Sequence, residues 1–259
     1  MKILFLGNSH TYYNDMPQIF ANICKERGKD VDVAMQAQSG VTYGWHYGKL
    51  IELRFALMYG GYDYIIMQQA AHSPCPSKEE TLADGMKIIE LARRYGVVPI
   101  QTMPWAEKRS PEHQYEMYEI YEELAEKAGV RINPVGRIFE DIFNNYPEIN
   151  MYWLDGEHAS EYGSYAAALC TYATIFAESV KGVSPKSYYT YPLSQETWNE
   201  ISRAYAEAAA CPCDRALAKK ADALWNEKAK PVLDEKEAER VLDTDKAEII
   251  QELVDKYTL

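Results

Sequence analysis

The chain has 259 residues, of which 47% are hydrophobic, so it can bury a sizeable core in one large domain or a domain with an appendage. The formal net charge of −12 argues against nucleic-acid binding, which needs a basic surface, and against docking on anionic membranes. No stretch approaches the roughly 20 apolar residues of a membrane-spanning helix.

Targeting and redox signals in the chain are weak. The start, MKILFLGNSH, has one lysine and an apolar run that is too short for a signal peptide. The five cysteines are odd in number and scattered, which is typical of free thiols in a reducing compartment. We therefore expect a cytoplasmic protein. Cys211 and Cys213 lack a second cysteine or histidine pair at ligand spacing, so we expect no metal site.

Short apolar stretches alternate with amphipathic ones through the first two thirds of the chain. The strand-like stretches are 2–7, 31–37, 62–68, 97–104 and 130–136. The helix-like stretches are 14–28, 49–59, 77–96, 110–129, 136–146 and 161–180, and the third begins with a capping box, Ser77 to Glu80. This alternation predicts an α/β fold of three layers, with a mostly parallel five-stranded sheet between helices.

The tail differs in composition from the rest. From residue 194 the chain is charged, Ala-rich and helical in pattern, and it contains no candidate chemistry. We predict an α/β domain over 1–193 and a C-terminal helical extension over 194–259. The extension would pack on the domain or form a homo-oligomer.

Three polar or small residues follow the first three predicted strands: Ser9, Gly40 and Gln68. In a parallel sheet these positions share the carboxyl edge, where ligand sites lie. A serine at that edge can act as a nucleophile if a base, a group that orients the base and oxyanion donors are present. The alternative is that Asn8 and Ser9 are ordinary loop residues.

The strongest candidate for the base is His158. Asp155 stands three residues before it, and on a tight turn its carboxylate can bind the imidazole Nδ1. The alternative is that the acidic residues favour the start of the next helix. His113 falls on a predicted surface helix, and His10 would point away from Ser9 on an extended segment. The chain lacks G-x-S-x-G, G-x-G-x-x-G, Walker A and H-E-x-x-H.

Taken together, these motifs resemble the SGNH hydrolase superfamily, the broad GDSL esterase/lipase class, over about residues 2–180. Members carry Gly-Asp-Ser or Gly-Asn-Ser after the first strand, a glycine after the second and Asp-x-x-His near the end of the domain. The corresponding residues here are Gly7-Asn8-Ser9, Gly40 and Asp155 to His158. The third family motif, Gly-x-Asn-Asp, is absent. The chain instead reads Gln68-Gln69, which resembles some sugar-deacetylating branches.

The resemblance implies a flavodoxin-like SGNH fold and a catalytic Ser9, His158 and Asp155. It implies an oxyanion hole from the backbone N–H groups of Ser9 and Gly40 and the side-chain amide of Gln68, with Gln69 as the other candidate donor. Asn8 would brace the serine turn. No metal or organic cofactor is implied.

The expected reaction is hydrolysis of short-chain acyl esters, with O-acetyl groups on a carbohydrate as the preferred substrate. Five residues near the active edge are candidates for a substrate pocket, although such aromatic residues can equally pack loops: His10, Tyr12, Trp45, His46 and His72. The alternatives are an acyltransferase with the same triad, a non-catalytic carbohydrate-binding protein and a flavodoxin-like nucleotide binder. The expected partner is a small-molecule or saccharide ester, with no nucleic acid and no membrane.

Overall fold

A computed structural model describes residues 1–71, 75–188, 193–229 and 239–259. Its central sheet has five strands: β1 (Lys2–Gly7), β2 (Asp32–Ala37), β3 (Tyr64–Gln68), β4 (Val98–Thr102) and β5 (Arg131–Asn133). Their order is β2-β1-β3-β4-β5, and every pairing is parallel. The predicted α/β fold with a five-stranded parallel sheet is therefore confirmed.

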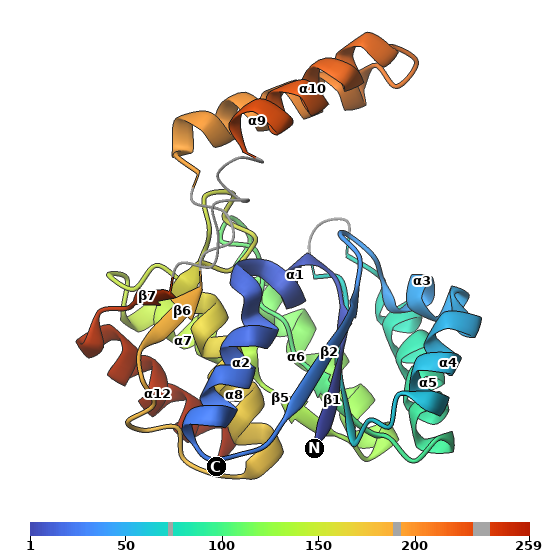
Figure 1. The fold of residues 1–259 in the computed structure, drawn as a ribbon, viewed down its shortest axis with the longest axis vertical. Helices are drawn as coiled ribbons and strands as arrows, with labels where there is room; N and C mark the ends of the chain where they lie inside the picture. Colours follow the sequence, from blue (N-terminus) through green and yellow to red (C-terminus); the bar gives the residue numbers. More distant parts are fainter. Residues whose placement is uncertain (72–74, 189–192, 230–238) are drawn as a thin grey trace. The chain divides into compact units, whose positions relative to one another are not determined.

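One face of the sheet is covered by α3 (Tyr43–Gly48), α4 (Leu50–Tyr59), α5 (Lys78–Arg94) and α6 (His113–Ala128) (Figure 1). Leu4 and Leu6 of β1 pack on this side with Leu53, Ile88 and Leu124 of three of these helices. Side chains alternate along a strand, so Leu4 and Leu6 point to the same face. Burial of these aliphatic side chains fixes the register of β1.

The opposite face is covered by α2 (Met16–Glu26), α7 (Val135–Asn145), α8 (Glu161–Phe176) and α12 (Thr244–Thr258), which completes the three layers (Figure 1). Phe5 of β1 meets Phe20 of α2 edge to face, with ring centroids 5.5 Å apart. Asn133 at the end of β5 donates to the Thr171 hydroxyl of α8 at 2.9 Å. Apolar and polar contacts therefore both hold this layer on the sheet.

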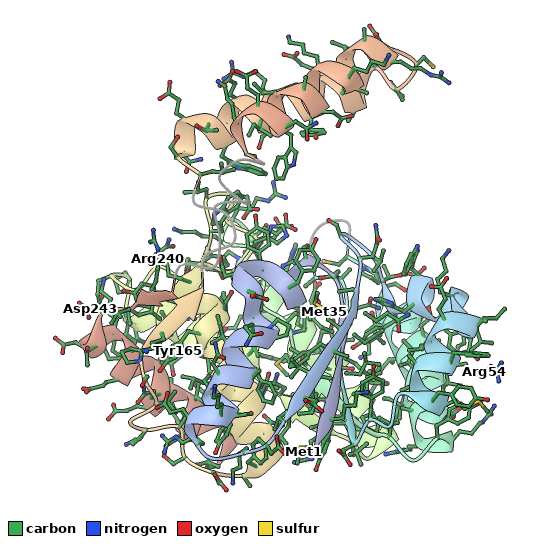
Figure 2. All side chains as sticks on the ribbon, in the orientation of Figure 1. Met1, Met35, Arg54, Tyr165, Arg240 and Asp243 are labelled. Atoms are coloured by element: carbon green, nitrogen blue, oxygen red, sulfur yellow. The ribbon has the colours of Figure 1, made fainter. Side chains whose placement is uncertain are left out.

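The last helix, α12, packs in the same layer as α7 and α8. The hydroxyl of Tyr165, which Figure 2 shows on α8, accepts a hydrogen bond from Gln251 at 2.9 Å. Asp141 of α7 accepts from Lys256 at 2.8 Å and from Tyr257 at 2.7 Å. These contacts, and the burial of the apolar side of α12, place the helix within the α/β unit.

The division of the chain consequently differs from the predicted one, which was an α/β domain over 1–193 and an extension over 194–259. One compact unit comprises Met1–Ser187 with Val241–Leu259, and the other comprises Tyr188–Arg240. The physical reason is the amphipathic pattern of α12, which buries Ala247, Ile250 and Val254. The high charge of the whole tail hid this pattern in the sequence.

The second unit contains α9 (Gln195–Ala210) and α10 (Arg215–Lys228), packed side by side. The Tyr205 hydroxyl donates to Asp222 at 3.1 Å, and Lys228 pairs with Glu200.

Two short strands that the sequence did not indicate, β6 (Lys186–Tyr188) and β7 (Glu239–Val241), pair with each other. Among the described residues, no helix combines the length and apolar character needed to cross a membrane.

Local structure after β1 also differs from expectation. Residues 9–12 form a short helix, α1 (Ser9–Tyr12), followed by a 3₁₀ turn, η1 (Tyr13–Asp15). The Asn8 side chain caps α1 by accepting from the His10 N–H, so the serine lies in a helical turn and not on an extended segment. The predicted capping box of α5 is confirmed, since Ser77 and Glu80 bind each other's backbone N–H groups.

Candidate active site

The turn after β1 places Ser9 at the carboxyl edge of the sheet. Asn8 accepts from the His10 N–H at 3.0 Å and donates through Nδ2 to the Val41 carbonyl at 3.1 Å. Gly7 permits this close packing, because a Cβ there would lie 2.1 Å from Thr11 Oγ1. The turn is therefore held by its own cap and by the loop that follows β2.

A second loop, before α8, orients His158. Asp155 Oδ1 accepts from the backbone N–H groups of Glu157 and His158, each at 2.9 Å. The other carboxylate oxygen, Oδ2, lies 2.6 Å from His158 Nδ1. The Trp153 N–H donates to the His158 carbonyl at 2.7 Å, which closes the loop on itself. One carboxylate thus holds both the backbone and the imidazole.

The two segments meet at a hydrogen bond. His158 Nε2 lies 2.7 Å from Ser9 Oγ, although the residues are 149 positions apart in sequence. Asn14 reinforces the junction, because its amide donates to the Ala159 carbonyl at 2.8 Å and to Ser164 Oγ at 2.9 Å. Asn14 has a φ of +51°, a left-handed conformation that asparagine tolerates better than most residues. Ser9, His158 and Asp155 therefore form one continuous hydrogen-bonded chain.

The electrostatics of the chain select one imidazole tautomer. Burial of Asp155 opposes its ionisation, but the hydrogen bond and charge of His158, together with two backbone N–H groups, hold the pKa of this carboxyl below its usual value. An ionised Asp155 can only accept, so His158 Nδ1 carries a proton. Nε2 is then free to accept the Ser9 hydroxyl proton.

Aromatic side chains pack around His158. The Tyr13 ring stacks on the imidazole with centroids 4.3 Å apart, and the His10 ring stacks at 5.1 Å. Trp105 donates through Nε1 to the Glu157 carbonyl at 2.9 Å and stacks on Phe139 at 4.2 Å. The sequence did not indicate these roles of Trp105 and Tyr13, because nothing in it pairs either residue with the Asp155–His158 loop.

Of the five residues predicted to line a substrate pocket, the four that the structure describes differ widely in exposure. His10 is buried beside His158, Tyr12 is half-buried and Trp45 is 39% exposed with Lys49 over its ring. His46 is buried, and its Nε2 donates to the Gly7 carbonyl at 2.8 Å. Burial lowers the pKa of His46, so it is a neutral structural side chain. His72 lies outside the described residues.

Two backbone N–H groups stand available as oxyanion donors. Within the described residues, neither the Ser9 nor the Gly40 N–H donates a hydrogen bond, and Gly40 has a φ of +68°, which favours glycine. The predicted third donor, the Gln68 amide nitrogen, instead donates to the Gln69 carbonyl. The side-chain oxygen of Gln69 accepts from the Tyr43 N–H at 2.7 Å.

One group in the described part of the chain has metal-ligand chemistry. Potential ligand atoms of His10, Glu157 and His158 lie within 4.8 Å of one another. Both nitrogens of His158 are already bound, however, to Asp155 and to Ser9. A cation would therefore have to break the Ser9–His158 hydrogen bond, so this group does not fit a resident metal.

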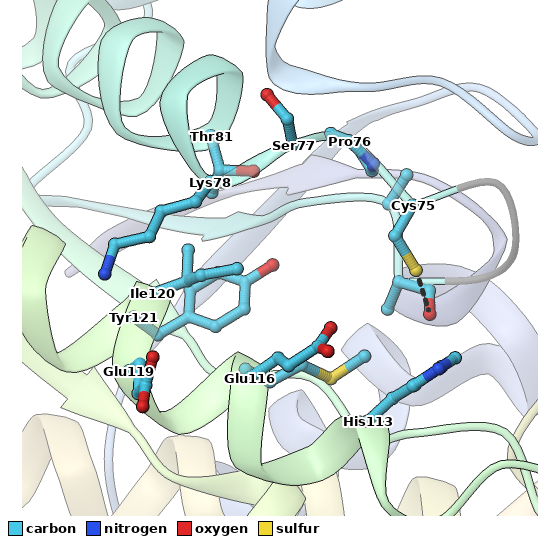
Figure 3. Close-up of a pocket in the computed structure, with 13 residues that line it drawn as sticks. Cys75, Pro76, Ser77, Lys78, Thr81, His113, Glu116, Glu119, Ile120 and Tyr121 are labelled. Carbon is cyan, nitrogen blue, oxygen red and sulfur yellow. Dashed lines mark hydrogen bonds between the residues drawn. The ribbon is translucent and has the colours of Figure 1, made fainter.

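A cavity of about 380 Å³ opens between the end of β3, the start of α5 and one side of α6 (Figure 3). Ala71, Met117 and Tyr121 form its apolar part, and Glu116 and Glu119 form its acidic part. Figure 3 shows the Glu116 carboxylate and the His113 ring beside Cys75. The cavity is at the carboxyl edge of the sheet, one strand away from β1.

Solved structures share this architecture. An SGNH-hydrolase-like protein from Slackia heliotrinireducens matches 68% of this chain and 98% of its own at 25% identity, with a TM-score of 0.59. A DUF4886 family protein from Bacteroides uniformis covers 99% of this chain and 93% of its own at 16% identity, with a TM-score of 0.66. An acetyl-xylooligosaccharide esterase from Geobacillus covers 68% and 94% at 14% identity, with a TM-score of 0.57.

No protein-family model and no curated protein sequence matches the chain. The likeness to known proteins is therefore one of structure, and at these identities it establishes the fold. Esterases, including an acetyl xylan esterase, recur among the solved structures that share it. The predicted resemblance is confirmed at this level: the chain has the fold of the SGNH hydrolases.

Proposed function

We propose that this protein is a serine esterase that hydrolyses short-chain acyl esters, with Ser9 as nucleophile, His158 as general base and acid, and Asp155 as the group that orients His158. The single observation that carries the proposal is the hydrogen-bonded chain from Ser9 Oγ to His158 Nε2 at 2.7 Å and from His158 Nδ1 to Asp155 at 2.6 Å. This is the arrangement that nucleophilic ester cleavage requires.

The reaction has two halves. Ser9 Oγ attacks the ester carbonyl carbon while its proton passes to His158 Nε2. The tetrahedral intermediate collapses as His158 returns that proton to the departing alcohol, leaving an acyl group on Ser9. A water then attacks the acyl-enzyme with His158 again as base, and the acid leaves. Asp155 keeps its charge throughout and stabilises the imidazolium.

The oxyanion of each tetrahedral intermediate would be bound by the backbone N–H groups of Ser9 and Gly40. Both are free of hydrogen bonds to the described residues, and both follow neighbouring strands, β1 and β2. Loss of one such donor commonly lowers kcat by about 100- to 1000-fold. Proline is the one substitution that removes a backbone N–H, but its φ is fixed at about −65° and Gly40 has a φ of +68°. The donors are therefore tested through the residues that hold the two loops.

The preferred substrate is an acetyl ester of a carbohydrate. Supporting this choice, proteins of the same fold include an acetyl-xylooligosaccharide esterase and an acetyl xylan esterase. We assign the alcohol part of the ester to the cavity beside β3, because β3 neighbours β1 and the cavity lies at the same edge of the sheet as Ser9. The cavity lining carries two carboxylates, Glu116 and Glu119, against one lysine, Lys78, and that lysine also pairs with Glu123 at 2.7 Å. A neutral sugar is therefore favoured over one that carries a carboxylate.

The test is hydrolysis of p-nitrophenyl acetate, butyrate and octanoate by the wild type, by Ser9→Ala and by a matched control, Ser184→Ala, which loses a hydroxyl outside the site. We expect Ser9→Ala alone to lose activity, by about 1000-fold or more, and acetate to be the best ester. Acetate release from acetylated neutral sugars is then compared with release from acetylated uronic acids. This comparison tests whether the alcohol part of the substrate is a neutral sugar.

Each outcome has a distinct meaning. Equal rates for wild type and Ser9→Ala would contradict the esterase proposal and favour a non-catalytic carbohydrate-binding protein. If the enzyme transfers the acetyl group from Ser9 to an added sugar faster than it releases acetate to water, it is an acyltransferase. A preference for octanoate, or for uronic acid esters, would leave the triad standing and overturn the proposed substrate.

A further inference from the structure

Two consecutive amide side chains, Gln68 and Gln69, end the third strand beside the nucleophile turn. They are only 5% and 1% exposed, and β3 lies between β1 and β4 in the sheet. Buried amides are hydrogen-bonded almost without exception, so their partners reveal their role. The SGNH resemblance assigned Gln68 to the oxyanion hole, as a donor.

The contacts of Gln68 identify it as an acceptor. Its Oε1 accepts from the Asn8 N–H at 3.3 Å and from the Thr11 hydroxyl at 2.9 Å. The Asn8 N–H can only donate, so the atom that faces it must be the amide oxygen. The amide nitrogen then faces the Gln69 carbonyl, which can only accept. Both ends of the side chain are chemically matched in this orientation.

This acceptor holds the segment on both sides of the nucleophile. Asn8 precedes Ser9 and Thr11 follows it by two residues, and both are tied to the same oxygen on β3. The Thr11 N–H also binds the Asn8 carbonyl at 2.9 Å. The direction of the Ser9 N–H and of Ser9 Oγ is therefore set from the neighbouring strand.

Gln69 performs the matching task for the loop that carries Gly40. Its Oε1 accepts from the Tyr43 N–H at 2.7 Å, and its Nε2 lies 3.4 Å from Thr81 Oγ1. Asn8 joins the two loops, because its Nδ2 donates to the Val41 carbonyl. The two glutamines thus connect the strand to both loops, those of Ser9 and Gly40, whose N–H groups have no partner in the described part of the chain.

We propose that Gln68 and Gln69 are positioning residues, whose side-chain oxygens fix the loops of Ser9 and Gly40, and that the oxyanion is bound by backbone N–H groups without the Gln68 amide. The effect of this arrangement on catalysis rests on the proposed esterase function. The hydrogen bonds from Asn8 and Thr11 to Gln68 Oε1, here called the Gln68 brace, are a property of the fold. This assignment replaces the donor role predicted for Gln68 with an acceptor role.

A double-mutant cycle between Thr11 and Gln68 distinguishes a positioning role of Gln68 from an oxyanion-donor role. The Thr11 hydroxyl binds the Gln68 oxygen and is not a proposed oxyanion donor. We expect Thr11→Val to lower kcat for p-nitrophenyl acetate about 10-fold with KM nearly unchanged, and Thr11→Ser to restore most of it. Gln68→Leu should lower kcat about 100-fold, and adding Thr11→Val should lower it no further.

If Gln68 is instead an oxyanion donor, Thr11→Val will leave kcat within about 2-fold of wild type, and the two substitutions will act independently. That result would overturn the proposal. Thr11→Val removes only one hydroxyl, so it keeps the test valid if Gln68→Leu fails to fold.

Amide hydrogen exchange of the peptide that contains residues 7–13 provides a readout without catalysis. Exchange should accelerate about 10-fold or more in Thr11→Val and Gln68→Leu and stay near the wild-type rate in Thr11→Ser. Unchanged exchange in both would overturn the brace even in an active enzyme. If the wild type shows no Ser9-dependent hydrolysis, the proposed esterase function is wrong. The hydrogen-exchange rates of residues 7–13 would still show whether Gln68 holds the turn.

Discussion

The nucleophile turn and the Asp155–His158 loop reach the same hydrogen bond by different means. The turn after β1 depends on distant residues, since Asn8 and Thr11 are bound to Gln68, about sixty positions away. The Asp155–His158 loop is mostly self-contained, because one carboxylate binds two N–H groups and the imidazole within four residues. Single substitutions in the loop should therefore lower kcat strongly. Single substitutions in the turn should lower kcat by smaller amounts, because several hydrogen bonds share the task of holding it.

The largest effect is expected in the self-contained loop. His158→Ala should lower kcat by about 10⁴-fold or more, because the Ser9 hydroxyl loses the base to which it is hydrogen-bonded. Ester hydrolysis by wild type and variant is the measurement, with Ser184→Ala as the matched control. Retention of a tenth of wild-type kcat would mean that His158 is not the base.

Asp155→Asn and Asp155→Ala separate charge from loop structure. The Asn oxygen can still accept from Glu157 and His158, so the loop should persist while kcat falls by about 10³- to 10⁴-fold. The Ala variant should also lose about 1 kcal/mol of unfolding free energy, because two part-buried N–H groups lose their acceptor. Denaturant unfolding of the two variants is the check, and equal stabilities would contradict the loop's dependence on this carboxylate.

In the nucleophile turn, Asn8→Ala should have a smaller effect. It removes the cap on the His10 N–H and the tie to the Val41 carbonyl but leaves Gln68 bound to the backbone. We expect kcat to fall about 10-fold, and unfolding free energy to fall by about 1 kcal/mol. Asn8→Asp, which keeps the capping oxygen, is the matched control. A 1000-fold loss of kcat in Asn8→Ala would mean that the hydrogen bonds from Gln68 cannot hold the turn without the Asn8 side chain.

Trp105→Phe tests one of two hydrogen bonds that the described residues show between the Asp155–His158 loop and the segment after β4. The other runs from the Lys108 N–H to the Gly156 carbonyl at 2.8 Å. The ring can still stack on Phe139, but the donor to the Glu157 carbonyl is lost. We expect a fall of about 3-fold in kcat and about 1 kcal/mol in stability. A loss in kcat as large as that in Asp155→Asn would mean that the loop is not self-contained.

The smallest effect is a pH dependence of stability. The pKa of Asp155 is held below its usual value in the folded chain, so its ionisation favours folding. The extra stability of wild type over Asp155→Asn, on the order of 1 kcal/mol, should be complete above the unfolded pKa of about 4. It should disappear as pH falls through the folded pKa. Denaturant unfolding between pH 3 and 7 measures it, and a difference that grows toward acid would contradict the sign.

The contrast between the two regions also explains what sequence could predict. The parallel sheet followed from alternating apolar and amphipathic stretches, and the Asp155–His158 contact from a local spacing of three residues. The role of Gln68 did not follow, because its partners are far away in sequence and an amide side chain can donate or accept equally well. The contact of His46 did not follow for the same reason, since only the fold shows that it binds the Gly7 carbonyl. The amphipathic face of α12 was hidden by the charge of its surroundings.

Covalent labelling is the measurement that decides whether Ser9 is an activated nucleophile. Wild type, Ser9→Ala and His158→Ala are exposed to a fluorophosphonate, and intact mass and peptide mapping locate the adduct. We expect one phosphonyl group on Ser9 in wild type, none in Ser9→Ala and labelling slowed by about 10³-fold or more in His158→Ala. An unlabelled wild type, or an adduct that forms equally fast in Ser9→Ala, would contradict this role of Ser9.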